Sequence, residues 1–242
     1  MGGGRCRGGH VVPLHSGEMS EPLLHPHRAT LVEELTHLRR IVADMGELVD
    51  AAITLATSGL AERDVSMCAR VIADDALVND RQRELRELSF SLIVSQGPSA
   101  RDLREVIGLL NMSSELERMG DHCVSIAKLA RNLADLPPLE TYVDVPKMAA
   151  YCSDQIRGIL AAVVSRDVLQ ARRIAAGDDR VDRIYHRLFD DLIQMMTEDN
   201  TTVFRATNLV FIAHHLERIA DRVTNIAEDL VFLDSGAIEE LG

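Results

Sequence analysis

The sequence predicts an all-α protein built as two tandem three-helix bundles, with six long antiparallel helices that arose by internal duplication. Composition, apolar periodicity and a repeated motif predict this fold. Aromatic residues make up 3% of the chain and Trp is absent, while 46% of the residues are hydrophobic. That composition is typical of packed helices rather than of a β-sandwich or barrel. A chain of 242 residues is also long enough to bury a substantial core.

The duplication is marked by the motif Leu-Glu-Arg-x-x-Asp, which stands at 116–121 and again at 216–221. An ungapped alignment of 109–133 with 209–233 gives eight identities in 25 positions. The identities include both Glu, both Arg and both Asp of the motif. Two unrelated helices would share fewer identities, so the two halves of the chain are copies of one unit.

The first half predicts three helices, over 30–59, 62–96 and 99–134. From Leu31 to Ile53 apolar residues recur every three or four positions, which is the spacing of an amphipathic helix. Gly59 is expected to end this helix. The second helix ends at the breaker Gln96-Gly97-Pro98, and the third follows directly.

A proline-rich linker over 136–146 separates the halves, because three prolines in eleven residues cannot continue a helix. The second half predicts helices over 146–165, 168–197 and 201–233. The resulting organisation is a disordered N-terminal extension (1–28), a first three-helix repeat (29–135), the linker (136–146) and a second repeat (147–235).

The third and sixth helices carry a heptad-like apolar seam, with intervals of three and four residues from Leu109 to Leu133 and from Leu209 to Leu233. This seam predicts that Cys123 is a core residue and not a nucleophile. It also places the Glu and Asp of each motif on a stripe that points away from the central core.

Charge and targeting signals limit the classes of function. The formal net charge of −12 and the lack of a basic run argue against binding nucleic acid. No apolar run reaches the ~18 residues of a membrane span, so we expect no membrane insertion. The four cysteines are widely spaced and form no CxxC pair, which favours reduced thiols and a cytoplasmic protein.

The acidic pairs of the motif are candidate metal ligands. Two carboxylates four residues apart on a helix repel each other, so the pair calls for a cation, either an arginine or a metal ion. The second and fifth predicted helices offer matching pairs at an offset of 103 residues. The predicted ligands of the two sites are Asp75, Asn79, Glu117 and Asp121 in the first half and Asp178, Asp182, Glu217 and Asp221 in the second.

Oxygen ligands of this kind suit divalent or trivalent metal ions, with iron, zinc, manganese and magnesium all open. His186 and His214 lie on the acidic stripes of the second half and could add nitrogen ligands there. Because the first site has Asn79 in place of an acid, the sequence favours Glu217 and Asp221 as the stronger site.

Two alternatives remain open. The acids could be solvated and neutralised by Arg118 and Arg218, which would make the chain a metal-independent helical scaffold. A carboxylate-bridged metal store or oxidase would need inward-facing Glu and ExxH pairs on four helices. Here the only ExxH is Glu34 to His37, in the first predicted helix.

Residues 31–233 resemble the PhoU family of bacterial phosphate-uptake regulators. The duplicated motif carries most of the resemblance, supported by the acidic segments 75–79 and 178–182 and by Pro98-x3-Asp102-Leu103-Arg104. The resemblance implies tandem three-helix repeats and a metal-binding E(D)xxxD motif, carried here by Glu117, Asp121, Glu217 and Asp221. Asn79 departs from the family pattern, and so does Asn200, where the family often has proline.

The resemblance also implies a role. We expect a cytoplasmic adaptor that links a phosphate ABC transporter, through a PstB-like ATPase subunit, to a PhoR-like sensor histidine kinase and so represses phosphate-starvation genes. A homodimer is expected. The sequence has no P-loop and no nucleophile beside a base, so we expect a binding protein and not an enzyme.

Overall fold

The computed structural model describes residues 26–139, 144–177 and 179–241, together with Met1. Within these residues the secondary structure is helical and contains no strand, which confirms the all-α prediction. Six helices have 20 or more residues: α1 (Pro26–Glu62), α2 (Val65–Gln96), α3 (Ala100–Leu133), α4 (Asp144–Ser165), α6 (Asp179–Glu198) and α7 (Val203–Ser235). The short elements are α5 (Val168–Ala175) and the 3-10 turn η2 (Asn200–Thr202).

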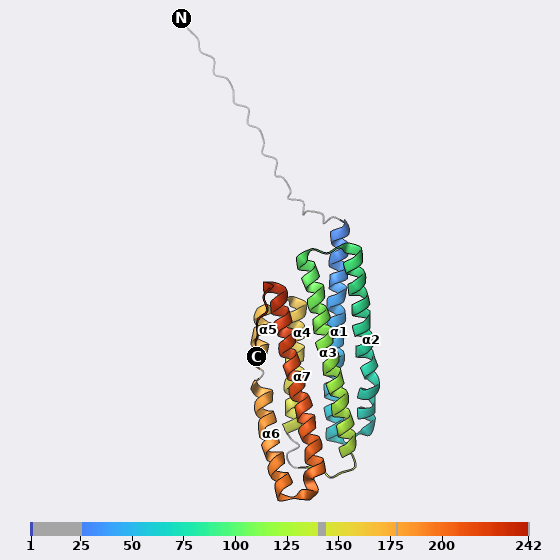
Figure 1. Cartoon of the computed structure of the whole chain (residues 1–242), viewed down its shortest axis with the longest axis vertical. Coiled ribbons are helices and arrows are strands. Elements are labelled where there is room, and N and C mark those ends of the chain that lie inside the picture. Colours follow the sequence, from blue (N-terminus) through green and yellow to red (C-terminus); the bar gives the residue numbers. More distant parts are fainter. Residues whose placement is uncertain (2–25, 140–143, 178, 242) are drawn as a thin grey trace.

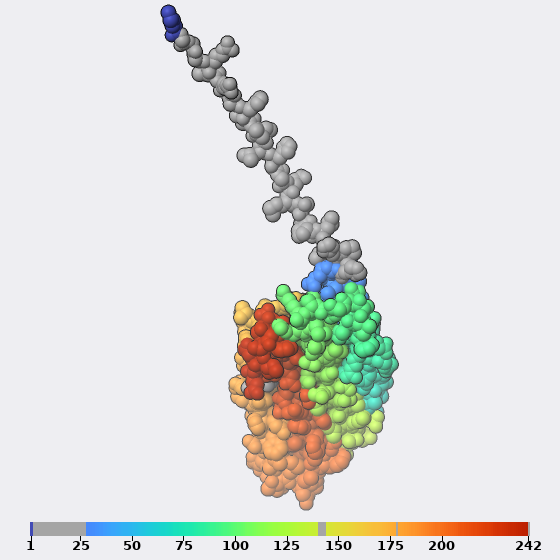
Figure 2. Space-filling view, turned by 45° about the horizontal axis from the view of Figure 1, so that its top comes forward, coloured from blue at the N-terminus to red at the C-terminus, as the bar shows by residue number. Residues whose placement is uncertain are grey.

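The long helices run roughly along one axis, and the two repeats lie side by side (Figure 1). The main contact between the repeats joins α3 to α7, and α1 packs against α4. Helix α2 covers α1 and α3 on one flank, while α5 and α6 cover α4 and α7 on the other. One continuous hydrophobic core runs through both repeats. In Figure 2 they form adjacent halves of one body.

The predicted heptad seam is buried in both copies. In α3 and α7 the seam positions are almost inaccessible to solvent, and only the final Leu133 and Leu233 are half-buried. Cys123 is fully buried, as predicted, and burial next to Cys152 raises the pKa of its thiol. The seam therefore lies in the core that the repeats share, and a nucleophilic role for Cys123 has no support.

The first helix does not end at Gly59 as predicted, but continues to Glu62. A Cβ atom at Gly59 would lie 2.9 Å from the Sγ atom of Cys68 on α2. Glycine therefore serves here to let α1 and α2 approach, not to end the helix. The turn itself is made by Arg63, whose φ of 59° is left-handed, and by Asp64, which caps α2.

The prediction of one continuous helix over 168–197 is wrong. The helix is interrupted after Ala175, where the N–H of Gly177 donates to the carbonyl oxygen of Ile174 at 2.9 Å. A bond over three residues closes α5 and lets the chain restart as α6. Helix α2, the counterpart in the first repeat, runs unbroken for 32 residues.

The two halves are connected by a segment that is partly outside the described residues. Helix α4 begins at Asp144, two residues before the predicted start at Pro146. The carbonyl oxygen of Pro137 accepts a hydrogen bond from Nη1 of Arg205 at 3.0 Å, which ties the start of the linker to α7. The predicted disorder of the extension lies almost wholly outside the described residues, although α1 already begins at Pro26. In the described part of the chain, no helix is long and apolar enough to cross a membrane.

Candidate functional site

Helices α2 and α3 bring the four predicted ligands of the first half to one surface, which we call the first acidic cluster (Asp75, Asn79, Glu117 and Asp121). Nδ2 of Asn79 donates to Oδ2 of Asp75 at 3.0 Å. A Cβ atom on Gly120 would lie 3.2 Å from Oδ1 of Asp75. The carboxylate of Asp75 therefore packs against α3 at Gly120, which lies between Glu117 and Asp121 in the sequence.

The carboxylates of the first acidic cluster repel one another. Burial raises the pKa of Asp75, and the nearby charge of Asp121 raises it further. Burial likewise raises the pKa of Glu117, with added contributions from Asp121 and Asp75 that Arg118 and Arg86 oppose. In the described structure, none of the three carboxylates Asp75, Glu117 and Asp121 forms an ion pair. The neighbouring Arg118 pairs with Glu115 instead, at 3.2 Å. The negative charge of the first acidic cluster is therefore only partly offset, by nearby cations that form no ion pair with it.

Helices α6 and α7 form the second acidic cluster (Asp182, Glu217 and Asp221), and the predicted ligand Asp178 lies outside the described residues. Two of its carboxylates have nitrogen-bearing side chains as neighbours. Nη1 of Arg218 lies 2.6 Å from Oδ2 of Asp221, and Nδ1 of His214 lies 3.5 Å from Oε2 of Glu217. Burial and the charge of Asp221 raise the pKa of Asp182. Oδ1 of Asp182 is buried without a hydrogen-bond partner.

His186 and His214 lie close to the second acidic cluster, on α6 and α7. The ring of Tyr185 stands near both, with centroid distances of 5.6 Å to His186 and 6.2 Å to His214. His186 favours the charged form of Asp182. Nitrogen ligation of a metal at these histidines stays a hypothesis.

The donor set of both clusters suits a hard cation. Repulsion within the first acidic cluster, and the unpartnered oxygen of Asp182 in the second, are conditions that a bound cation relieves. Among the described residues, however, no group of three or more His, Cys, Asp or Glu side chains is already arranged to hold a metal ion.

Helices α3 and α7 are joined by a row of polar contacts that the sequence analysis did not predict. Oε2 of Glu115 accepts hydrogen bonds from Nη1 of Arg222 at 3.0 Å and from Nδ2 of Asn225 at 2.9 Å. Further along, the Nδ1 atoms of His122 and His215 lie 3.1 Å apart, so one ring donates and the other accepts. Burial lowers the pKa of His122 to about 4 and also lowers that of His215. Both rings are therefore neutral at pH 7.

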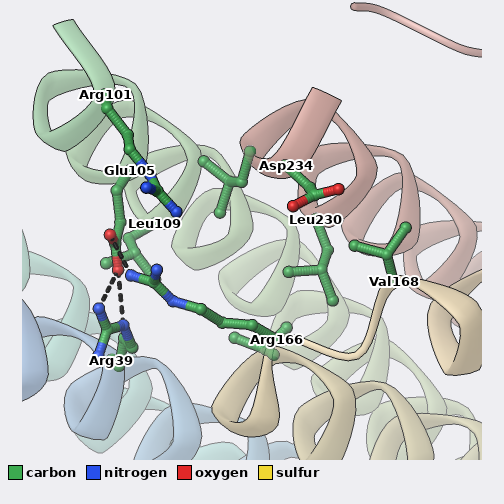
Figure 3. A pocket seen from close by; sticks show the side chains of 10 residues that line it. Arg39, Arg101, Glu105, Leu109, Arg166, Val168, Leu230 and Asp234 are labelled. Atoms are coloured by element: carbon green, nitrogen blue, oxygen red, sulfur yellow. Dashed lines mark hydrogen bonds and ion pairs between the residues drawn. The ribbon is translucent and has the colours of Figure 1, made fainter. Parts of the chain in front are cut away.

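A pocket where the two repeats meet was also missed. Three arginines from separate segments, Arg39, Arg101 and Arg166, gather at the carboxylate of Glu105 (Figure 3). No basic run in the sequence indicates them, because the fold alone brings together residues about 60 positions apart. Asp234 on α7 lies across the pocket from Glu105 (Figure 3).

Fold and surfaces together define an internally duplicated helical protein with two acidic clusters and an arginine-lined pocket, in which α3 and α7 make the main contact between the repeats. The PhoU domain model matches this chain twice, over residues 42–130 and 145–230. The chain belongs to the PhoU family. Its two matches fall on the two repeats that the structure packs side by side.

Relatives and solved structures agree with this assignment. The chain is 32% identical over 206 residues to a phosphate-specific transport system accessory protein PhoU homolog of Rhizobium meliloti, covering 85% of this chain and 87% of the relative. It is 34% identical over 208 residues to the homolog of Aquifex aeolicus, covering 86% and 94%.

Two crystal structures share the fold. The phosphate transport system regulatory protein PhoU from Streptococcus pneumoniae has a TM-score of 0.82 and 30% identity, covering 87% of this chain and 100% of its own. PhoU from Pseudomonas aeruginosa also has a TM-score of 0.82, with 28% identity, covering 86% and 100%.

Proposed function

We propose that this protein regulates phosphate homeostasis as a cytoplasmic, homodimeric adaptor. It restrains phosphate uptake and phosphate-starvation signalling by linking the ATPase subunit of a phosphate ABC transporter to a sensor histidine kinase. One observation carries the proposal: over most of both chains the protein matches relatives named as phosphate-specific transport accessory proteins. It acts by binding, and not by catalysis.

Genetic complementation tests this role. In a strain that lacks the gene, phosphate-starvation genes stay expressed in phosphate-rich medium, and the plasmid-borne chain restores their repression. Co-purification of the tagged chain at high and at low phosphate then identifies its partners. If the chain leaves a starvation reporter unchanged and captures neither transporter nor kinase under either condition, the proposal is wrong.

Metal ions would bind at the acidic clusters. In the first cluster Asp75, Glu117 and Asp121 would provide carboxylate oxygens and Asn79 an amide oxygen, and in the second the ligands would be Asp182, Glu217 and Asp221. A bound divalent or trivalent cation, such as iron, zinc, manganese or magnesium, would neutralise these acids and cross-link the helices that carry them. The repulsion among Asp75, Glu117 and Asp121, none of which forms an ion pair in the described structure, supports the first cluster most strongly.

Paired variants test the metal sites. We expect Glu117→Gln with Asp121→Asn to remove more bound metal than Glu217→Gln with Asp221→Asn, because Arg218 already pairs with Asp221 in the second cluster. The measurement is metal content after anaerobic purification, followed by titration with manganese and zinc. Equal and negligible metal in the wild type and both variants would rule out the sites.

A metal-independent helical scaffold is the second candidate. The ion pair between Arg218 and Asp221 favours it, since an arginine there takes the place of a metal. In this case the acids dock basic partner surfaces, and partner capture persists after chelation. Retention of the partners in EDTA, with their loss in Asp121→Lys, would support the scaffold over the metal protein.

A further inference from the structure

The pocket at the junction of the repeats is built from five helical segments. Arg39 comes from α1 and Glu105 from α3, while Arg166 lies between α4 and α5 and Asp234 on α7. Apolar side chains of both repeats form its wall: Leu109, Val163, Val168, Leu230 and Leu233. The cavity, which is partly open to solvent, has a volume of about 70 Å³. That volume admits several water molecules or one small ion, since one water needs about 10 to 15 Å³.

The pocket is locally positive in an acidic protein. Three arginines and two carboxylates line it, while the chain as a whole carries a formal net charge of −12. Arg39 reaches Oε1 of Glu105 through Nε at 2.6 Å and Nη2 at 2.5 Å, and Arg166 pairs with the other carboxylate oxygen. Arg101 has no hydrogen bond or ion pair in the described structure, and its guanidinium points toward the other two (Figure 3).

The backbone at Arg166 is held in an unusual conformation. Its φ of 56° is in the left-handed region, at the position that follows a helix and is usually glycine. The N–H of the next residue, Asp167, donates to the carbonyl oxygen of Ala162 at 2.9 Å, which is the six-to-one bond of this helix ending. A side chain at this position costs about 1 kcal/mol relative to glycine. Here the strained residue directs a guanidinium into the pocket.

The duplicated turn shows that this orientation is not obligatory. Arg63 stands at the equivalent position between α1 and α2, with a φ of 59°. Its Nε donates to the carbonyl oxygen of Ala134 at 2.7 Å, which is a purely structural contact. Arg63 also lines a cavity with a second arginine, Arg205, but both guanidinium groups donate there to backbone carbonyl oxygens. Arg166 instead joins two other arginines and two carboxylates.

We propose that this pocket binds inorganic phosphate. The arginines supply planar donors suited to a tetrahedral oxyanion. Glu105 and Asp234 can each accept a hydrogen bond from a protonated oxyanion, and phosphate keeps a proton at neutral pH whereas sulfate does not. The cavity is too small for a nucleotide, which needs a pocket of about 300 Å³ or more. The inference deepens the proposed function, on which it rests for its regulatory meaning.

Phosphate in this position would bridge the two repeats. Arg39 and Arg101 belong to the first repeat and Arg166 to the second, so one anion would tie α1 and α3 to the turn before α5. The apolar wall lowers the local dielectric and strengthens the attraction between guanidinium and anion. Binding would therefore stabilise one arrangement of the repeats, which is how a ligand can alter the docking of a partner.

Calorimetric titration of the full chain with inorganic phosphate tests the inference. We expect Arg101→Gln to weaken binding at least about tenfold, because a hydrogen bond to a charged group is lost. Arg101 is exposed and has no partner within the described structure, so the variant should fold normally. Arg40→Gln is the matched control, since it removes an equal charge from an exposed position beside Arg39. It should change the affinity less than about twofold.

Sulfate provides the second arm. The wild type should prefer phosphate, and Asp234→Ala should abolish that preference by weakening phosphate binding and improving sulfate binding. If phosphate fails to bind at concentrations up to about 10 mM, or if Arg101→Gln and Arg40→Gln behave alike, the inference is wrong. If the wild-type chain represses the starvation reporter but binds no phosphate, the proposed phosphate site is wrong and the proposed regulatory function still holds.

Discussion

The two copies of the acidic motif share a sequence but differ in their neutralisation. In the first copy Arg118 pairs with Glu115 and leaves Glu117 and Asp121 without an ion pair in the described structure. In the second copy Arg218 pairs with Asp221 at 2.6 Å. Residue 215 explains the difference, because the position equivalent to Glu115 is occupied there by a neutral histidine. One substitution next to a duplicated motif can thus decide whether its acids need an external cation.

The same substitution changes the joint between the repeats. Helices α3 and α7 run antiparallel, so the contact of Glu115 with Arg222 has a symmetry-related counterpart in the contact of His215 with His122. The first is an ion pair with both side chains less than one-fifth exposed, and the second is a hydrogen bond between neutral rings. The two contacts occupy equivalent places but should differ strongly in their tolerance of substitution.

The largest expected effect comes from breaking the ion pair. Arg222→Met should lower the free energy of unfolding by about 2 to 3 kcal/mol, because it removes the buried partner of the Glu115 carboxylate and leaves only the exposed Arg118 as an ion-pair partner. Urea unfolding followed by circular dichroism measures the change. The double replacement of His122 and His215 by leucine should change stability by less than about 1 kcal/mol, since both polar partners are removed together.

A double-mutant cycle isolates the ion pair itself. Glu115→Gln combined with Arg222→Met should recover part of the loss, because the buried charge is then gone. If the leucine pair destabilises the protein as much as Arg222→Met does, the two contacts are energetically equivalent and the comparison fails.

The pH dependence of stability gives the next effect. Burial raises the pKa of Asp229 to about 6; the hydrogen bond from Asn111 opposes the shift and Glu115 and Glu228 add to it. Because the folded pKa exceeds the unfolded value, the native state holds its proton more tightly. The contribution of Asp229 to stability should therefore fall by about 1 to 2 kcal/mol as the pH rises from about 4 to about 6, and change little above that. His122 and His215 contribute with the opposite sign over this range, because their pKa values are lowered, so the effect of Asp229 is read from the difference between the wild type and the variant.

Asp229→Asn should remove this dependence and make the protein more stable at pH 7 by a similar amount. Unfolding curves at several pH values measure it, with Asp234→Asn as an exposed control on the same helix. The equivalent positions in the other copy are Leu129 and Phe211, so no matching transition is expected there. An unchanged pH profile in Asp229→Asn would place the transition elsewhere.

Local sequence patterns were sufficient for most of the fold. The heptad seam predicted both central helices and the burial of Cys123, since a three-and-four apolar spacing allows only one inward face. Two predicted helix boundaries were wrong, because tertiary contacts and not the local sequence determine them. Gly59 looked like a helix end but serves a close approach to Cys68, and the break at Gly177 has no counterpart in the unbroken α2.

The candidate sites were predictable only where repetition revealed them. The duplicated motif identified Glu117 and Asp121, and the offset of 103 residues identified Asp75, which the fold places against α3 at Gly120. The sequence did not predict the pocket arginines or the pair of His122 and His215, because the residues that meet there are not separated by the repeat offset. The comparison of the two copies as cation sites depends on Glu115, which pairs with Arg118 and also accepts hydrogen bonds from Arg222 and Asn225 on α7. The contacts with α7 could not be predicted from the sequence.

The smallest expected effect has opposite signs in the two copies. Without metal, Asp121→Asn should stabilise the protein by about 0.5 kcal/mol, because it relieves repulsion with Asp75 and Glu117. Asp221→Asn should destabilise it by about 0.5 kcal/mol, because it removes the ion pair with Arg218. Thermal unfolding in EDTA resolves shifts of this size.

Metal ions should make Asp121→Asn destabilising instead of stabilising, and should leave Asp221→Asn destabilising. With manganese present, the wild type would gain stability from a cation on the first acidic cluster, and Asp121→Asn would lose that gain. Destabilisation by both variants in EDTA would mean that Asp121 has a favourable neighbour after all. The two acids would then be equivalent, and the first cluster would have no greater need of a cation than the second.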